Sequence, residues 1–151
     1  MTEIPRASAS AVAIIETPNS FIAEGRPDIP GQLANSGKVG LLGGHIEPDQ
    51  TPYDAIRSEL DQELGFRLIG PLKLVEDSDV ESQNRHGETA LRHVSLFHVA
   101  VSSVAELSMQ LPETTIVEIP KTILGVNSHK HRVTPYTFRV LHRAVTGELP
   151  K

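Results

Sequence analysis

The sequence predicts an α/β fold in which a mixed β-sheet lies between helices. The longest strand candidate, Leu91–Val101, has apolar residues on both faces, which is typical of a central strand covered on each side. Two further segments, Pro52–Leu64 and Pro135–Thr146, carry the residues that begin and end helices. Elements of this kind bury their apolar surfaces together in an α/β/α sandwich.

The composition indicates a globular protein without special features. A length of 151 residues predicts one domain, residues 1–151, with 38% hydrophobic and 22% charged residues. The net charge of −5 argues against a general nucleic-acid coat or an anionic membrane partner. The absence of cysteine excludes disulfides and thiol nucleophiles. No apolar run is long enough to span a membrane, and Met1–Ser10 lacks the hydrophobic core of a signal peptide, so a cytoplasmic location is the default expectation. The oligomeric state stays open.

The strand candidates before the first helix are short and are separated by turn residues. A small and β-branched run predicts a buried strand, and a TPNS turn leads into a second strand, so we expect a hairpin. The pair Gly43-Gly44 ends a third strand and permits close backbone approaches. These strands are Ala9–Glu16, Phe21–Glu24 and Lys38–Leu42, with a loop over residues 25–37.

Both ends of the first helix are specified by the sequence. Thr51 is placed to cap it, and Asp54 at the third helical position gives an aspartate version of the capping box. Pro52 suits the first turn, and Gly65 ends the helix. At about 100° per residue, the core-facing side should hold Tyr53, Ile56, Leu60 and Leu64.

Two glutamates, Glu59 and Glu63, lie together beside this apolar face. Like charges four residues apart cost roughly 0.2–0.5 kcal/mol, and a divalent cation between them would turn that cost into a gain. The alternative is a pair of solvated charges on a structural helix. That alternative is less attractive, because surface charges normally gather opposite the core.

The second half of the chain is predicted to add strands, a polar loop and helices. The run 77–89 has no apolar periodicity and is expected to be a loop, either a functional lid or a solvated connector. Gly147 closes the last helix. The remaining candidates are the strands Phe66–Ile69, Leu72–Glu76 and Ile116–Ile119 and a weak helix at Ser103–Met109.

Histidines and basic residues outside the first helix are further candidates for ligand binding. His93 and His98 fall on opposite faces of the central strand, where a packed histidine with a hydrogen-bond partner is the commoner role. The segment 127–132 (NSHKHR) gathers positive charge just before Thr134-Pro135, and such residues beside a helix N-terminus can hold phosphate. The plainer interpretation of this segment is a run of solvated residues on the surface.

The stretch Gly44–Phe66 resembles the Nudix box, G-x5-E-x7-R-E-U-x-E-E-x-G-U, in which U is a bulky apolar residue. Placing Gly65 on the last glycine puts Gly44 on the first without a gap. The other matching positions are Glu59, Leu60, Glu63 and Phe66. The preceding VGLLGGHIEP also resembles the family's entry into the box. The resemblance implies a Nudix-type α/β/α sandwich with a mixed central sheet.

Nudix proteins typically hydrolyse a nucleoside diphosphate linked to another group, so the resemblance implies a small nucleotide-like substrate and Mg²⁺ or Mn²⁺. It implies that Glu59 and Glu63 are catalytic and bind the metal, helped by the main-chain carbonyl of Gly43. The family's base often comes from a loop outside the box, for which Glu88 is the candidate, with His86 behind it. The candidate substrate-binding residues are Gly44, Arg85, Lys130 and Arg132.

The chain departs from the box at Gln50, Ser58 and Gln62, where the motif has Glu, Arg and the first Glu of its pair. The first two form a supporting ion pair in the family. Both members are lost together here, so no buried charge is left unpaired, and Gln50 could hydrogen-bond Ser58. Losses of this kind typically cost about 10–100-fold in metal affinity or activity. At position 62 an amide replaces a carboxylate ligand.

Two functions therefore stay open. The retained glutamate pair and Gly43-Gly44 favour a metal-dependent pyrophosphohydrolase of low or specialised activity. The three substitutions favour a catalytically impaired module that binds a nucleotide-like ligand or serves regulation.

Overall fold

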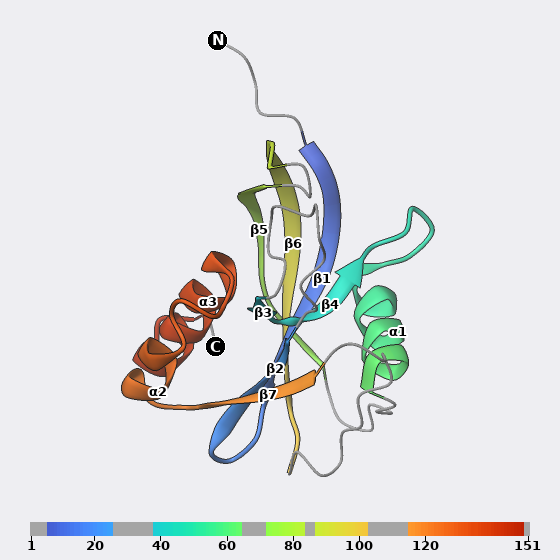
Figure 1. Cartoon of the computed structure of the whole chain (residues 1–151). Helices are drawn as coiled ribbons and strands as arrows, with labels where there is room; N and C mark the ends of the chain where they lie inside the picture. Colours follow the sequence, from blue (N-terminus) through green and yellow to red (C-terminus); the bar gives the residue numbers. More distant parts are fainter. Residues whose placement is uncertain (1–5, 26–37, 65–71, 84–86, 103–114, 150–151) are drawn as a thin grey trace.

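The architecture is a mixed β-sheet with helices on both faces, as the sequence predicts (Figure 1). The structure is a computed structural model that describes residues 6–25, 38–64, 72–83, 87–102 and 115–149. Helix α1 (Pro52–Leu64) lies on one side of the sheet, and α2 (Ile123–Ser128) and α3 (Pro135–Thr146) lie on the other. None of these described helices has the length and apolarity needed to cross a membrane.

The described part of the chain contributes seven strands to one sheet. β1 runs parallel to β6 along most of its length, whereas its pairings with β2 and β4 are antiparallel, so the sheet is mixed. The order is β3-β2-β1-β6-β5, with β4 beside β1 and β7 beside β2. The strands are β1 (Arg6–Glu16), β2 (Ser20–Gly25), β3 (Val39–Gly40), β4 (Leu42–His45), β5 (Lys73–Gln83), β6 (Thr89–Ala100) and β7 (Thr115–Pro120).

β1 and β2 diverge from their connecting turn, and the segment from β3 to β4 fills the space between them. Pairing between β1 and β2 is confined to the turn end, at Ile15 and Glu16. Farther along, β3 pairs with β2 and β4 pairs with β1, so Gly40 lies opposite Glu24 and Gly44 lies opposite Ala11. This wedge brings β2 and the glycine pair to the same region of the sheet.

Two apolar clusters occupy the two faces of the sheet. The cluster under α1 contains Ala11, Ala13, Ile15, Ile22, Leu42, Ala55, Ile56, Leu60, Leu72, Phe97, Val99 and Val101. The cluster under α2 and α3 contains Ile14, Phe21, Ala23, Val39, Leu41, Leu96, Ile119, Val126, Val133, Val140 and Leu141. Ile56 and Leu60 face the core as predicted, but Tyr53 is 43% exposed and meets Phe97 only edge-on, with ring centroids 5.0 Å apart.

β5 corrects two predictions. Residues 77–83 are strand, although their polar sequence predicts a loop, and the strand expected at Leu72–Glu76 runs on to Gln83. β5 pairs with β6 along this whole length, and polar cross-strand contacts support it. Asp77 accepts a hydrogen bond from Ser95 Oγ at 2.6 Å, and Asp79 lies 3.0 Å from His93 Nδ1. Hydrogen bonds to β6 therefore hold in the sheet a segment whose own sequence pattern does not indicate a strand.

The remaining elements agree with the sequence to different degrees. Helix α3 begins and ends as predicted: Thr134 Oγ1 accepts a hydrogen bond from the Thr137 N–H at 3.3 Å, and Gly147 is left-handed at φ 76°. The sequence pattern missed α2, and β4 continues through Gly43-Gly44 instead of ending before them. The predictions at Phe66–Ile69 and Ser103–Met109 lie outside the described residues.

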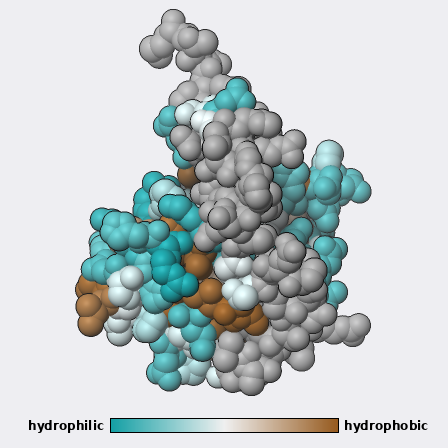
Figure 2. Space-filling view, viewed as in Figure 1, coloured by the Kyte–Doolittle hydropathy of each residue, from teal (hydrophilic) through white to brown (hydrophobic). Residues whose placement is uncertain are grey.

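Exposed apolar surface gathers on α2, toward the lower left of the space-filling view (Figure 2). Ile123 and Leu124 are 52% and 80% exposed, whereas Gly125 and Val126 of the same helix are buried. Only the middle of this short helix therefore contributes to the core.

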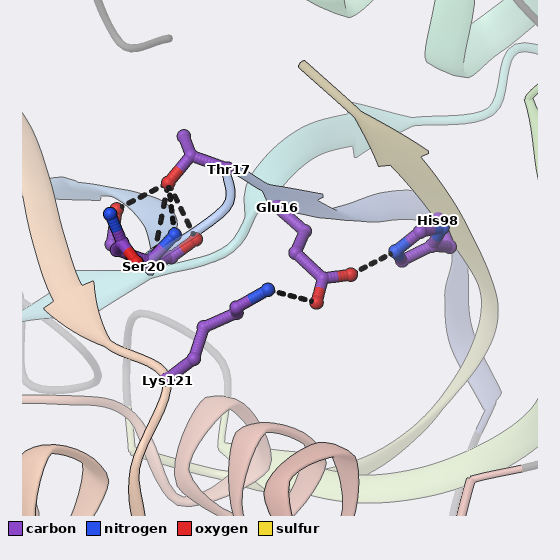
Figure 3. Close-up of polar contacts among 6 residues, drawn as sticks. Glu16, Thr17, Ser20, His98 and Lys121 are labelled. Atoms are coloured by element: carbon purple, nitrogen blue, oxygen red, sulfur yellow. Dashed lines mark hydrogen bonds and ion pairs between the residues drawn. The ribbon is translucent and has the colours of Figure 1, made fainter. Parts of the chain in front are cut away.

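The carboxylate of Glu16 links three segments at one end of the sheet (Figure 3). Glu16 ends β1 and accepts hydrogen bonds from His98 Nε2 of β6 at 2.6 Å and from Lys121 Nζ, just after β7, at 2.8 Å. Burial raises the pKa of Glu16, but the bonds from Lys121 and His98 outweigh burial and hold the pKa below its ordinary value. The charged form of Glu16 is therefore the one that the fold favours.

We expect Glu16→Gln to reduce the acid sensitivity of the protein. A carboxyl whose pKa is lowered by folding contributes stability above its unfolded pKa and loses that contribution as the pH falls through the folded value. The side chain is about a third exposed, so the difference should be about 1 kcal/mol or less. Urea unfolding at pH 7 and pH 3 measures it, with the exposed Glu47→Gln as control. Equal losses of stability on acidification in Glu16→Gln and wild type would contradict the prediction.

Candidate functional site

The capping box fixes the start of helix α1 as the sequence predicts. The N–H of Asp54 donates to Thr51 Oγ1 at 3.1 Å, and the N–H of Thr51 donates to Asp54 Oδ2 at 3.4 Å. Ala55 N–H also donates to the Thr51 carbonyl at 3.0 Å. The helix then packs on β1 and β4 through its buried residues Ala55, Ile56 and Leu60. These contacts set the position of the glutamates that follow.

Glu59 lies directly against the backbone of Gly44. A Cβ atom built on Gly44 would stand 2.5 Å from Glu59 Cδ and 2.6 Å from Glu59 Oε1. Only a residue without a side chain permits this approach. Gly44 therefore creates the space that the Glu59 carboxylate occupies.

Gly43 allows the backbone to close on β1 just before this point. Its φ of 153° is one that L residues rarely adopt, and a Cβ here would stand 2.1 Å from the Ala11 carbonyl oxygen. The two glycines thus have different roles. Gly43 lets β4 reach β1, and Gly44 makes room for the Glu59 side chain.

Glu63 is an acid buried at the edge of the core. Glu63 is only 7% exposed, and its Oε2 atom is buried without a hydrogen-bond partner in the described structure. Burial raises the pKa of Glu63 well above its ordinary value, and the neighbouring carboxyl groups of Glu24 and Glu59 raise it further. Glu63 is thus not a solvated surface charge.

Glu24 is the residue at this site that the sequence analysis missed. It lies in β2, is 6% exposed, and acts on Glu63 through both charge and side-chain hydrogen bonding. Its position in a strand of apolar and small residues was the available signal, because a charged residue is rarely buried unless something compensates it. The sequence does not show that β2 brings Glu24 to Glu63.

The carboxylates fit a divalent cation by chemistry, although they do not already enclose one. Among the described residues, no three His, Asp or Glu side chains form a preformed metal cage. Hard cations take oxygen ligands, and the buried Oε2 of Glu63 and the Glu59 carboxylate held against Gly44 supply such oxygens. A cation would also remove the repulsion that now acts on Glu63.

The positions that depart from the box turn away from this site. Gln62 Nε2 donates to Ser58 Oγ at 3.0 Å on the exposed side of α1. Gln50 Oε1 accepts from the Glu47 N–H at 3.1 Å, so the predicted bond between Gln50 and Ser58 is wrong. The reason is local, since Gln50 caps the turn that precedes the helix, while Ser58 meets Gln62 one helical turn farther on.

The remaining predicted site residues are not gathered around α1. Lys130 and Arg132 stand beside α3, with Lys130 over the Phe138 ring, so the sheet separates them from Glu59 and Glu63 (Figure 1). Glu88 precedes β6. It stands roughly 20 Å along that strand from Ser95, at about 3.3 Å per residue. Arg85 and His86 lie outside the described residues.

Both histidines of β6 have hydrogen-bond partners, as predicted. His98 meets Glu16, and His93 meets Asp79. Ser95 follows His93 by two residues and is buried. It lies in one row across the sheet with Asp77, Ala11 and Gly44. The sheet face that carries Gly44 therefore continues into a polar strip on β6 and β5.

We expect Gly44→Ala to weaken metal binding while leaving the fold intact. The new Cβ would displace the Glu59 carboxylate, which is the free end of a flexible side chain, and moving a ligand in this way should cost about 10–100-fold in affinity. Calorimetric titration with Mn²⁺ measures the loss. If the effect passes through Glu59, adding Gly44→Ala to Glu59→Gln should cause little further loss. Wild-type affinity in Gly44→Ala would contradict the prediction.

Solved structures with this architecture include several Nudix and MutT proteins. The MutT protein from Methanosarcina mazei Go1 is 17% identical, with a TM-score of 0.72 and 98% of each chain covered. The NUDIX domain of Shewanella oneidensis NrtR, solved with ADP ribose, is 14% identical with a TM-score of 0.69, covering 94% of this chain and 89% of that domain.

A third similar structure belongs to a larger protein. It is the bifunctional NMN adenylyltransferase/ADP ribose pyrophosphatase from Francisella tularensis, solved with AMP and a manganese ion. The identity is 18% and the TM-score 0.71, covering 97% of this chain but only 43% of that protein. No protein-family model and no curated protein matches the sequence.

Proposed function

The chain has the Nudix fold, and on this premise we propose that it is a metal-dependent hydrolase that cleaves the diphosphate linkage of a nucleoside diphosphate derivative. The observation that carries the proposal is the placement of Glu59 on α1 against Gly44, with Glu63 one helical turn farther on and buried. A structural helix would leave such charges in water. Here the fold brings them to the core margin, where a cation would stabilise them.

In this proposal Glu59 and Glu63 hold Mg²⁺ or Mn²⁺ together with the main-chain carbonyl of Gly43. A bound divalent cation supplies charge neutralisation of the diphosphate and lowers the pKa of a water molecule. Gly44 keeps the Glu59 carboxylate close to the backbone, which restricts the positions that this ligand can take. The capping box and the buried face of α1 keep the two glutamates in register with β4.

The reaction is a hydrolysis without a covalent enzyme intermediate. The oxygen of a water molecule bonds to one phosphorus atom, and the bridging P–O bond breaks with its electron pair passing to the departing phosphate. One proton of the water is released during this exchange. Glu59 and Glu63 would hold the cation, and the cation would supply positive charge that orients and stabilises the phosphate groups.

The proposed substrate class is a nucleoside diphosphate joined to a second group. Two of the similar structures were solved with ADP ribose or with AMP, which makes ADP ribose the first compound to test. The polar strip of Asp77 and Ser95 beside Gly44 offers hydrogen-bonding groups on the same sheet face. Carboxylate and hydroxyl groups suit the hydroxyls of a sugar.

A test of the function uses the wild-type protein, Mg²⁺ or Mn²⁺, and a panel of nucleoside diphosphate derivatives that includes ADP ribose. Hydrolysis is followed by chromatography of the nucleotide products. We expect metal-dependent product formation that EDTA stops, at a rate reduced by the lost supporting residues. Background rates with both metals across the panel would overturn the proposed activity.

A binding module without turnover is the second candidate, and one observation favours it. Gln62, which stands where the family has a carboxylate, is exposed and bonded to Ser58 on the outside of the helix. If the wild type binds ADP ribose in calorimetry but stays at background rates with both metals, this second function is the correct one. Hydrolysis that depends on Glu59 and Glu63 would exclude it.

A further inference from the structure

The position of Glu24 brings a carboxylate from the sheet to the glutamates of the helix. Glu24 shares the α1 side of β2 with Ile22, which belongs to the cluster under α1. It pairs with Gly40, two residues before the β4 strand that carries Gly43 and Gly44. Its carboxyl group interacts with that of Glu63. The wedge between β1 and β2 therefore places Glu24 beside the proposed metal site.

Glu63 provides an independent sign that a ligand belongs at this point. More than nine-tenths of the residue is buried, and Oε2 has no hydrogen-bond partner in the described structure. Buried polar atoms of native proteins are nearly always satisfied. An oxygen of this kind next to two other carboxyl groups, Glu24 and Glu59, requires a cation or a proton.

The helix lacks one carboxylate at the same place. Gln62 contributes an amide, and its side chain is turned outward to Ser58. A divalent cation held by Glu59 and Glu63 alone would keep fewer charged ligands than one with a third carboxylate. Glu24 approaches Glu63 from the sheet, out of β2.

Resting on the proposed function, we propose that Glu24 is a third carboxylate of the metal site and replaces, from β2, the helix carboxylate that is absent at Gln62. Its role is to bind the cation directly or to fix Glu63 as a ligand. Either role makes the metal affinity of this chain depend on a strand residue outside the box. The competing explanation is a proton shared between Glu24 and Glu63, which would stabilise the fold without any cation.

The experiment compares Mn²⁺ binding by the wild-type protein, Glu24→Gln and Glu118→Gln. Glutamine matches glutamate in shape, and Glu118 is an exposed residue of the adjacent strand β7, so the control removes the same charge from the same sheet. Titration calorimetry gives the dissociation constant of Mn²⁺ alone. Melting temperatures with and without Mn²⁺ give a second readout that needs no substrate.

We expect Glu24→Gln to weaken Mn²⁺ binding by about 10-fold or more and Glu118→Gln to leave it within about twofold. The Mn²⁺-induced rise in melting temperature should shrink in parallel in Glu24→Gln. An unchanged dissociation constant in Glu24→Gln overturns the proposal. So does a metal-free variant that melts at a lower temperature than the wild type but shows the same Mn²⁺-induced rise in melting temperature. The latter result would indicate the shared proton.

The conservative variant Glu24→Asp keeps the test decisive if Glu24→Gln does not fold. It retains the charge but shortens the reach by one methylene, so a metal-site role predicts weaker Mn²⁺ binding and a purely electrostatic role in folding does not. The two proposals fail separately. Hydrolysis with Mn²⁺ affinity independent of Glu24 would refute only the role of Glu24. Glu24-dependent Mn²⁺ binding without hydrolysis would refute only the enzyme.

Discussion

Glu63→Gln is expected to reduce metal-dependent hydrolysis by on the order of 100- to 1,000-fold, as the loss of one group that stabilises a transition state does in other enzymes. The amide keeps the shape of the side chain but removes the negative charge that the cation requires. Glu59→Gln should have a comparable effect, because Glu59 is the partner carboxylate one helical turn away.

The same substitution should leave the metal-free fold intact or stabilise it. Glu63 is buried, has an oxygen without a hydrogen-bond partner, and interacts with the like-charged Glu24 and Glu59. Burial and the neighbouring carboxyl groups disfavour the charged form of Glu63, and a neutral amide avoids this cost. Loss of activity combined with an unchanged or higher melting temperature would thus separate a functional role from a structural one.

Product formation from the best substrate of the panel measures the effect, with Asp61→Asn as the matched control. Asp61 is an exposed acid of the same helix, so its replacement removes one charge without touching the glutamate pair. We expect Asp61→Asn to retain nearly full activity. Wild-type activity in both Glu59→Gln and Glu63→Gln would refute the proposed site.

Gly43→Ala is expected to destabilise the fold by roughly 2–6 kcal/mol. About 1–3 kcal/mol of this comes from forcing an alanine into a positive φ, and about 1–3 kcal/mol from overpacking. The overpacking is severe because the new Cβ would stand 2.1 Å from the Ala11 carbonyl oxygen, which belongs to the central strand β1. Against a total stability of about 5–15 kcal/mol, such a loss threatens folding itself.

Gly147→Ala is the matched control for Gly43→Ala. Gly147 also has a positive φ, 76°, but a Cβ built on it meets nothing within 4 Å. Its replacement should cost only the strain, roughly 1–2 kcal/mol. Urea unfolding of both variants measures the difference. Equal destabilisation of the two would show that the contact between Gly43 and β1 is unimportant.

The local signals in the sequence were sufficient for the start of α1, for both ends of α3 and for the core-facing positions Ile56 and Leu60. Thr51 and Asp54 at one helix, and Thr134 and Gly147 at the other, act through hydrogen bonds within a few residues, so their effect can be read from the chain alone. The spacing of Glu59 and Glu63 fixed their common side for the same reason. Periodicity and caps are local properties.

Long-range pairing decided the points that the sequence analysis did not reach. Residues 77–83 are strand because β6 pairs with them, and Gln50 bonds to Glu47 instead of Ser58 because the turn before α1 brings that N–H to it. Lys130 and Arg132 gather positive charge in the sequence, yet the sheet separates them from the glutamates. No periodicity encodes these relations between distant segments.

The sequence by itself determined the α/β class, both ends of α3, the start of α1 and the glutamate pair beside the glycine turn. Only the tertiary structure decided that Glu63 is buried, that Glu59 lies against Gly44, and that Glu24 joins them from β2. The physical reason is that β1 and β2 diverge around β3 and β4. This divergence carries a residue 39 positions before Glu63 to the same site, and nothing in the local sequence of either residue reports it.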